Sequence, residues 1–224
     1  MARIVMADDG IPFNGVTVEN GPLGGAESAF IALAQGLARR GHEVIACTTM
    51  QEGVKHKGVD WRPLVANSPD MGVPDAPDLY IANRGDKLIP LAPNAKRAAF
   101  WIHNPARYVL KWRYLSKLWK RKPAIVFIGD YHATTYPSWA PGGKRYTIPY
   151  GVDDLFRTAQ TPSLPPAPRA VFTSNPLRGL DWIVSMWVTR VHPRVKNAEL
   201  HIYSGPETYG AAGATKAAEM EGVL

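Results

Sequence analysis

Cysteine and long apolar segments are what this sequence most clearly lacks. Cys47 is the single cysteine among 224 residues, so no disulfide can form within the chain, and a reducing compartment such as the cytoplasm is expected. No run of about 18 apolar residues occurs, which predicts that no helix crosses a membrane. The N-terminal residues 1–9 turn acidic too early to predict a signal peptide.

The common metal-binding and nucleophile motifs are also missing. There is no D-x-D, no H-E-x-x-H and no cysteine pair. The adjacent acidic pairs Asp8-Asp9 and Asp153-Asp154 would point their side chains apart on a strand. Neither a serine nucleophile elbow nor a Walker loop is present. We therefore expect no metal site.

The composition predicts a folded, cationic protein. Hydrophobic residues make up 46% of the chain and charged residues 20%, as in globular proteins with a sizeable core. The formal net charge of +7 favours anionic partners, namely nucleotide phosphates, acidic lipid headgroups or nucleic acid. Charge alone does not choose among them.

A glycine-rich turn at residues 21–27 (GPLGGAE) and the helix expected after it organise the first part of the chain. Its three glycines allow φ > 0 and close approach of a ligand. Residues 28–40 carry apolar side chains at helical spacing. A turn of this kind presents free N–H groups and the positive end of the helix dipole to an anion. The G-x-x-G-G spacing is not the dinucleotide fingerprint, and a loop that simply needs glycine to turn is the alternative.

Apolar runs of strand length alternate with helices. We expect strands at 3–7, 42–48, 59–65, 78–84, 98–103, 124–128 and 144–149, a short helix or turn at 130–136, and loops at 8–23 and 66–77. A strand–loop–helix–strand unit predicts a parallel sheet, in which ligands bind beyond the C-terminal strand ends. That edge would gather the glycine turn with Asn83, Arg84, His103 and Asn104.

A proline-rich segment divides the chain. Residues 161–168 contain four prolines and predict a stiff linker. The pattern then resumes with a strand at 170–173, a loop at 174–178, a helix at 180–191 and a strand at 199–203. We expect an α/β protein with a Rossmann-like parallel sheet in residues 1–160 and a partial second Rossmann-like domain in residues 169–224.

Residues 108–122 predict a basic, aromatic helix. One stripe would carry Tyr108, Trp112, Leu115 and Trp119, and another face Arg113, Lys117 and Lys120. The aromatic stripe either packs on the sheet and leaves the cations in solvent, or lies at an anionic membrane surface.

Four short motifs follow one another along the chain: residues 24–27 (GGAE), His103 with Asn104 at a predicted strand end, residues 148–153 (IPYGVD), and residues 178–181 (RGLD). In this order they resemble the G-G-x-E loop, the strand-end histidine, the I-P-N-G-V-D segment and the K-G-x-D element of GT4-type retaining glycosyltransferases of the GT-B fold. Tyr150 stands where that family has asparagine. The resemblance covers the first domain and the start of the second.

The resemblance implies sugar transfer from a nucleotide sugar, of the UDP or GDP type, to a carbohydrate or lipid-linked acceptor, with retention and without a metal or other cofactor. His103 would contact the sugar or the acceptor, and Arg178 would neutralise the departing diphosphate; both are the candidate catalytic residues. The candidate donor- or substrate-binding residues are Gly24, Gly25, Glu27, Asn83, Arg84 and Asn104.

The chain also departs from the family pattern. Two complete α/β domains need roughly 250 to 400 residues, and the family's E-x7-E motif is matched only by Glu199 and Glu207, the first of which begins a predicted strand. Ser174 and Asn175 occupy the stretch where the family has a further arginine.

Three hypotheses follow. The first is a cytoplasmic glycosyltransferase, peripheral at the inner face of the membrane, present here as a truncated or partial enzyme. The second is a non-catalytic acceptor- or membrane-binding fragment without the donor half. The third, a nucleic-acid-binding protein, rests on the net charge and seven tryptophans but lacks a motif, so no nucleic acid partner is expected.

Overall fold

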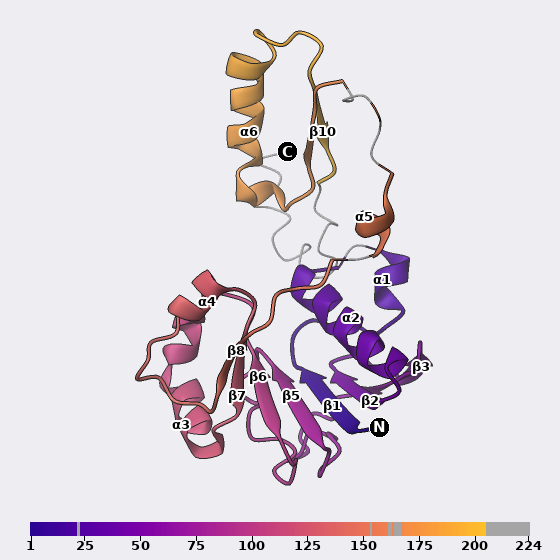
Figure 1. Cartoon of the computed structure of the whole chain (residues 1–224), viewed down its shortest axis with the longest axis vertical. Coiled ribbons are helices and arrows are strands. Elements are labelled where there is room, and N and C mark those ends of the chain that lie inside the picture. Colours follow the sequence, from indigo (N-terminus) through magenta and orange to yellow (C-terminus); the bar gives the residue numbers. More distant parts are fainter. Residues whose placement is uncertain (22, 153, 161–162, 164–166, 205–224) are drawn as a thin grey trace. The chain divides into compact units, whose positions relative to one another are not determined.

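The computed structural model describes residues 1–21, 23–152, 154–160, 163 and 167–204 (Figure 1). Residues 1–21 and 25–151 form one compact unit, and residues 23–24 with the described part of 152–204 belong to a second. The predicted linker at 161–168 lies largely outside the described residues, and the predicted domain limits stay a prediction.

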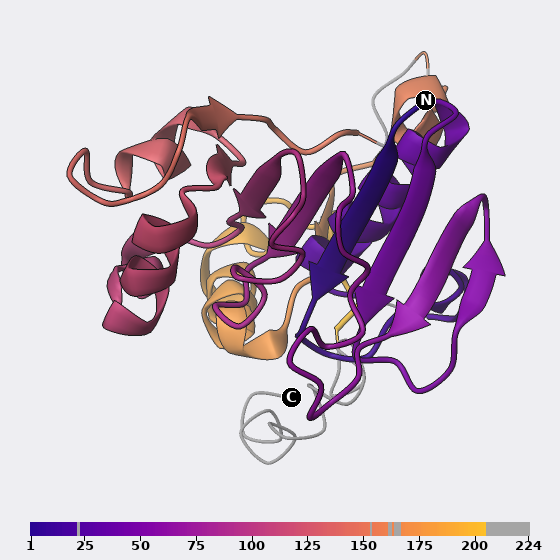
Figure 2. The same cartoon turned by 90° about the horizontal axis from the view of Figure 1, so that it is seen from below.

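An eight-stranded sheet forms the centre of the first unit, as the alternation of apolar runs predicts (Figures 1 and 2). Its order is β3-β4-β2-β1-β5-β6-β7-β8, and every neighbouring pair is parallel except β3 with β4. The strands are β1 (Arg3–Asp8), β2 (Glu43–Thr48), β3 (Val54–His56), β4 (Val59–Pro63), β5 (Leu79–Asn83), β6 (Ala98–Trp101), β7 (Ala124–Phe127) and β8 (Arg145–Thr147). This confirms a Rossmann-like α/β fold.

One strand is missing from the sequence prediction. β3 is only three residues long and pairs antiparallel with β4 through a two-residue turn at Lys57 and Gly58. Both turn residues have positive φ, 46° and 79°, as a tight hairpin turn requires. A lysine at the first turn position is an uncommon choice, so the hairpin is hard to recognise from the sequence.

Helix α2 (Gly25–Arg39) packs on β2 and β4 through the apolar face that its spacing predicts. Phe30 lies at the centre of this contact, with ring centroids 5.5 Å from Phe13 and 6.2 Å from Trp61. The predicted loop before α2 contains one short helix, α1 (Thr17–Asn20), and α4 (Asp130–Thr134) forms where a short helix or turn is expected.

The prediction of a single helix at 108–122 is wrong, because two helices form there. A 3₁₀ helix, η1 (Ala106–Leu110), ends at Lys111, whose backbone is extended, and α3 (Trp112–Arg121) then begins. Lys122 closes α3 in the left-handed region and donates its N–H to the Leu118 carbonyl. The break changes which residues share a face, so periodicity counted across it is out of phase.

Of the two alternatives for the aromatic stripe, packing on the sheet does not hold for its two tryptophans. Tyr114 and Leu118 are the buried residues of α3, whereas Trp112 and Trp119 are 77% and 71% exposed. Tyr114 packs against Phe100 of the sheet. The helix has apolar residues on two sides, and the sequence pattern does not say which side meets the sheet.

The second unit contains a parallel strand pair, β9 (Arg169–Phe172) and β10 (Glu199–Ile202), joined through helices as predicted. The connection comprises η2 (Pro176–Arg178), α6 (Leu180–Met186) and a π-helical turn, η3 (Trp187–Val191). A short helix not predicted from the sequence, α5 (Asp154–Thr158), precedes them. Gly179, between η2 and α6, has φ 93°, a conformation that favours glycine. No helix in the described residues is long and apolar enough to span a membrane.

Candidate functional site

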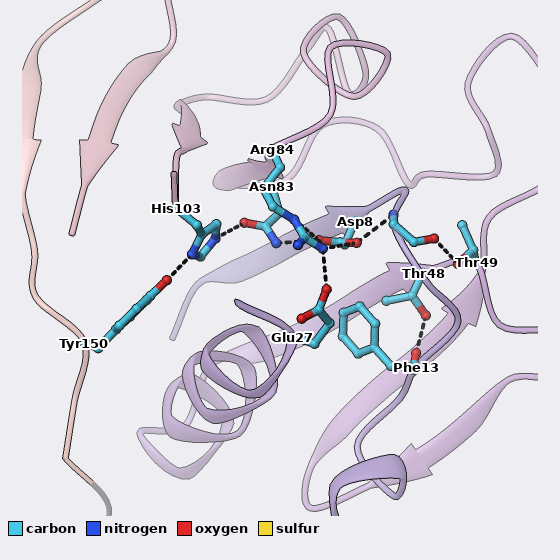
Figure 3. Close-up of polar contacts among 10 residues, drawn as sticks. Asp8, Phe13, Glu27, Thr48, Thr49, Asn83, Arg84, His103 and Tyr150 are labelled. Carbon is cyan, nitrogen blue, oxygen red and sulfur yellow. Dashed lines mark hydrogen bonds and ion pairs between the residues drawn. The ribbon is translucent and has the colours of Figure 1, made fainter. Parts of the chain in front are cut away.

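The strand register brings polar side chains together at the C-terminal edge of the first unit's sheet. Asp8 ends β1 and lies opposite Asn83, which ends β5. Asn83 in turn lies opposite Trp101, which ends β6, and His103 follows two residues later. Because these strands are parallel, their C-terminal ends meet at one edge, where the predicted residues Asn83, Arg84 and His103 do lie together (Figure 3).

Arg84 is held between two buried carboxylates (Figure 3). Its Nη2 atom lies 2.8 Å and 3.0 Å from the two carboxylate oxygens of Asp8 and 2.9 Å from Oε1 of Glu27. Asp8 has no exposed surface and also accepts the Gly10 N–H at 2.8 Å. Burial would lower the pKa of Arg84, but Asp8 and Glu27 outweigh it and hold that pKa above its ordinary value. The guanidinium is therefore permanently charged.

A tight turn after β5 directs Arg84 back toward Asp8. Arg84 has φ 59°, in the left-handed region that non-glycine residues seldom adopt. Its N–H donates to the Trp101 carbonyl at 3.1 Å, which ties the turn to β6. A Cβ atom on the next residue, Gly85, would meet the Asp9 carboxylate at 2.0 Å. The turn thus combines backbone strain with a close approach that only glycine permits, as is common near functional sites.

A second series of hydrogen bonds runs from Asp8 to the exposed side of the site (Figure 3). Asn83 donates from Nδ2 to Asp8 Oδ2 at 2.5 Å, which turns its Oδ1 atom toward His103. Nε2 of His103 lies 2.5 Å from that oxygen, and Nδ1 lies 2.5 Å from the hydroxyl of Tyr150. An amide oxygen only accepts, so Nε2 carries the proton and Nδ1 accepts from Tyr150.

His103 is kept neutral. Burial, together with the positive charge of Arg84 and the neighbouring His132, lowers the pKa of His103 to about 3. A general base works best with a pKa near the operating pH, so proton abstraction is not what this imidazole is suited for. Its ring lies 4.5 Å from Trp101 and stacks at 22° on Tyr150. The neutral imidazole of His103 can therefore accept a hydrogen bond at Nδ1.

The chain after His103 is fixed by a second buried histidine. His132, in α4, accepts the Ile128 N–H at 3.1 Å through Nδ1 and lies 2.7 Å from the Asn104 carbonyl through Nε2. The side chain of Asn104, a predicted binding residue, is exposed. Its backbone is thus held in place while its amide stays accessible to a ligand.

The remaining predicted site residues are distributed over both units. Gly25 opens α2, two residues before Glu27. Gly24 and Arg178 belong to the second unit, where Arg178 ends η2 and is exposed, with no ion-pair partner among the described residues. Gly21 is extended, with φ 168°, and so does not use the left-handed conformation that glycine allows.

Sequence reasoning missed two members of the site. In the sequence, Asp8 stands out only as half of an adjacent acidic pair. It also ends a buried strand, however, so the argument from strand ends that predicts Asn83 applies to it too. Tyr150 stands out only as a departure from asparagine. Glu199, half of the E-x7-E match, instead pairs with Arg169 at 2.8 Å; Glu207 lies outside the described residues. The described residues contain no group of three or more potential metal ligands.

Comparisons with known proteins identify relatives by structure alone. No protein-family model matches the chain, and no curated protein matches its sequence. Sucrose-phosphate synthase from Thermosynechococcus elongatus superposes with a TM-score of 0.63 at 14% identity, over 99% of this chain and 67% of that one.

Two further solved structures give similar superpositions. One is described as trehalose-6-phosphate from E. coli bound with UDP-2-fluoro glucose, with a TM-score of 0.56 at 12% identity, over 99% of this chain and 68% of that one. The other is WaaG, a glycosyltransferase involved in lipopolysaccharide biosynthesis, with a TM-score of 0.55 at 13% identity, over 99% and 69%. At these identities the likeness is one of fold, and in fold this chain is similar to the GT-B glycosyltransferases.

Proposed function

We propose that this chain is a nucleotide-sugar-dependent glycosyltransferase that resembles the GT4 type and transfers the sugar with retention and without a metal. The observation that carries the proposal is the neutral His103, fixed by Asn83 and Asp8 at the strand-end position where the sequence resembles the family's histidine. The fold likeness to sucrose-phosphate synthase and WaaG supports it.

Retaining transfer needs stabilisation of a departing diphosphate and a well-placed acceptor hydroxyl. Arg178, exposed and without an ion-pair partner among the described residues, is the cation proposed for the diphosphate. The N–H groups of Gly24 and Gly25, the latter at the N-terminus of the 15-residue helix α2, are proposed as further donors. His103 is proposed to accept a hydrogen bond from a hydroxyl of the sugar or of the acceptor.

Nucleotide binding tests this proposal directly. We expect UDP or GDP to bind the chain in calorimetric titrations, and Arg178→Gln to weaken that binding at least about tenfold, because a charge-assisted hydrogen bond to phosphate contributes roughly 1.5–3 kcal/mol. Arg169→Gln is a matched control, since this exposed arginine of the same unit already pairs with Glu199. A folded chain that binds neither nucleotide would contradict the proposal.

Tyr150 gives a second test, because its hydroxyl now occupies the acceptor atom Nδ1 of His103. Tyr150→Phe frees that atom while keeping the ring, so we expect the nucleotide sugar to bind more tightly and the affinity for UDP alone to stay unchanged. Calorimetry with both ligands measures the difference. Equal changes for the two ligands would show that His103 does not contact the sugar.

The alternative is a non-catalytic protein that binds the acceptor without transferring sugar. The chain spans 67–69% of the length of the three structures named above. Transfer of sugar from a nucleotide donor to a carbohydrate or lipid-linked acceptor, detected by mass spectrometry, would exclude this alternative. We also propose the cytoplasm as the site of action, because Cys47 is the single cysteine of the sequence and no disulfide can form within the chain.

A further inference from the structure

Helix α3 presents two tryptophans to solvent on the side away from the core. Trp112 and Trp119 are seven residues apart and so lie about 20° from each other around the helix axis. Their side chains are 77% and 71% exposed, whereas Tyr114 and Leu118 of the same helix are buried in the core. Two exposed indole rings leave a large apolar area in contact with water. This exposure is unfavourable, and another surface that covers the rings would remove the cost.

The free cations of this region lie beside these tryptophans. Arg113 and Lys117 both pair with Asp86, at 3.5 Å and 2.6 Å, so their charge is largely neutralised. By contrast, three exposed lysines at the two ends and on the outer side of α3 have no ion-pair partner among the residues that the structure describes: Lys111, Lys120 and Lys122. Of the predicted cationic face, Lys120 is thus the residue without an ion-pair partner in the described part of the chain.

Indoles and ammonium groups also share a hollow in the surface. It has a volume of about 490 Å³ and is lined by Trp112, Ser116, Trp119, Lys120 and Lys122. Its walls combine apolar ring faces with two positive charges, and it contains no acidic side chain. Such a lining complements a group that is anionic at one end and apolar at the other.

We propose that the outer face of α3, defined by Trp112, Trp119 and the three lysines, docks on an anionic lipid bilayer. Tryptophan is the residue that partitions best to the headgroup level, and each lysine near an anionic surface strengthens binding about fivefold. The contact is peripheral, with the indoles at the headgroup level and the lysines on lipid phosphates. This surface is separate from the strand-end site, so the inference does not depend on the proposed sugar transfer.

Vesicle binding by the whole chain tests this inference. We expect it to cosediment with vesicles of equal parts phosphatidylcholine and phosphatidylglycerol, to do so far less with phosphatidylcholine alone, and to show a blue shift of tryptophan fluorescence. Trp112→Ala combined with Trp119→Ala should weaken binding at least about tenfold. Replacing Lys111, Lys120 and Lys122 by glutamine should weaken it about 100-fold and reduce its salt dependence.

Matched controls come from elsewhere on the first unit. Trp139→Ala removes another tryptophan of similar exposure, 68%, and Lys55→Gln another exposed lysine, and neither should change binding. Circular dichroism establishes that each variant is folded. Equal binding to both vesicle types, no binding to either, or an equal loss in Trp139→Ala would overturn the inference. Binding of a DNA duplex at the same protein concentration, abolished by the same α3 variants, would assign the surface to nucleic acid instead.

Discussion

Replacing Arg84 with methionine should lower the free energy of unfolding by about 3–5 kcal/mol, the largest effect that we expect from a single substitution. The methionine fills a similar volume but leaves the carboxylate of Asp8, which has no exposed surface, and that of Glu27 without their shared cation. The cost is that of burying negative charge unpaired. Urea denaturation monitored by circular dichroism measures it.

Two comparisons show whether the buried charge is the cause. Arg62→Met removes an arginine that pairs with Asp60 at the surface, so it should cost no more than about 1 kcal/mol. Adding Asp8→Asn and Glu27→Gln to Arg84→Met should recover part of the loss, because no unpaired charge is then buried. A triple variant less stable than Arg84→Met would show that packing, rather than charge, dominates at this position.

Lowering the pH from 7 to 4 should remove about 3 kcal/mol of stability through His103 alone. The pKa of His103 is about 3 in the folded protein against an ordinary value of 6.5. Above pH 6.5 the imidazole is neutral in both states, so its contribution is complete. Between pH 6.5 and 3 the unfolded chain takes up a proton that the folded chain refuses, and unfolding becomes more favourable.

The comparison with His103→Gln isolates this contribution. Between pH 7 and pH 4, the free energy of unfolding of the unaltered chain should fall by about 3 kcal/mol more than that of His103→Gln. Urea denaturation at both pH values measures the two decreases. His192→Gln, which removes an exposed histidine, is the matched control. Parallel pH profiles for the unaltered chain and His103→Gln would mean that the imidazole titrates normally in the folded state.

Local patterns explain why most of the fold follows from the sequence. The strand–turn–helix–strand unit of β1, α2 and β2 can be predicted from residues close to one another in the sequence. The signals are the apolar periodicity and a glycine at each end of the helix. The strand edge that gathers Asn83, Arg84 and His103 follows from the same reading, because parallel strands have only one C-terminal edge. The roles of these residues in binding and catalysis stay predictions.

Contacts between residues far apart in the sequence could not be predicted, because local patterns do not say which groups meet in the fold. The hydrogen bond between Asn83 and Asp8 joins residues 75 positions apart, and that between His103 and Tyr150 joins residues 47 apart. The same limit applies to α3, where Trp112 and Leu118 are both apolar and only the neighbouring sheet decides which one is buried. Periodicity describes the two faces of an element and is silent about what each face meets.

The sequence by itself determined most of the alternation of strands and helices and the edge at which polar groups collect, because both follow from interactions between near neighbours and from the geometry of parallel strands. Only the tertiary structure decided that Arg84 is shared by Asp8 and Glu27, that His103 is neutral, and that two tryptophans of α3 face solvent. Charge state and exposure depend on which distant groups fold against a side chain, and local sequence does not contain that information.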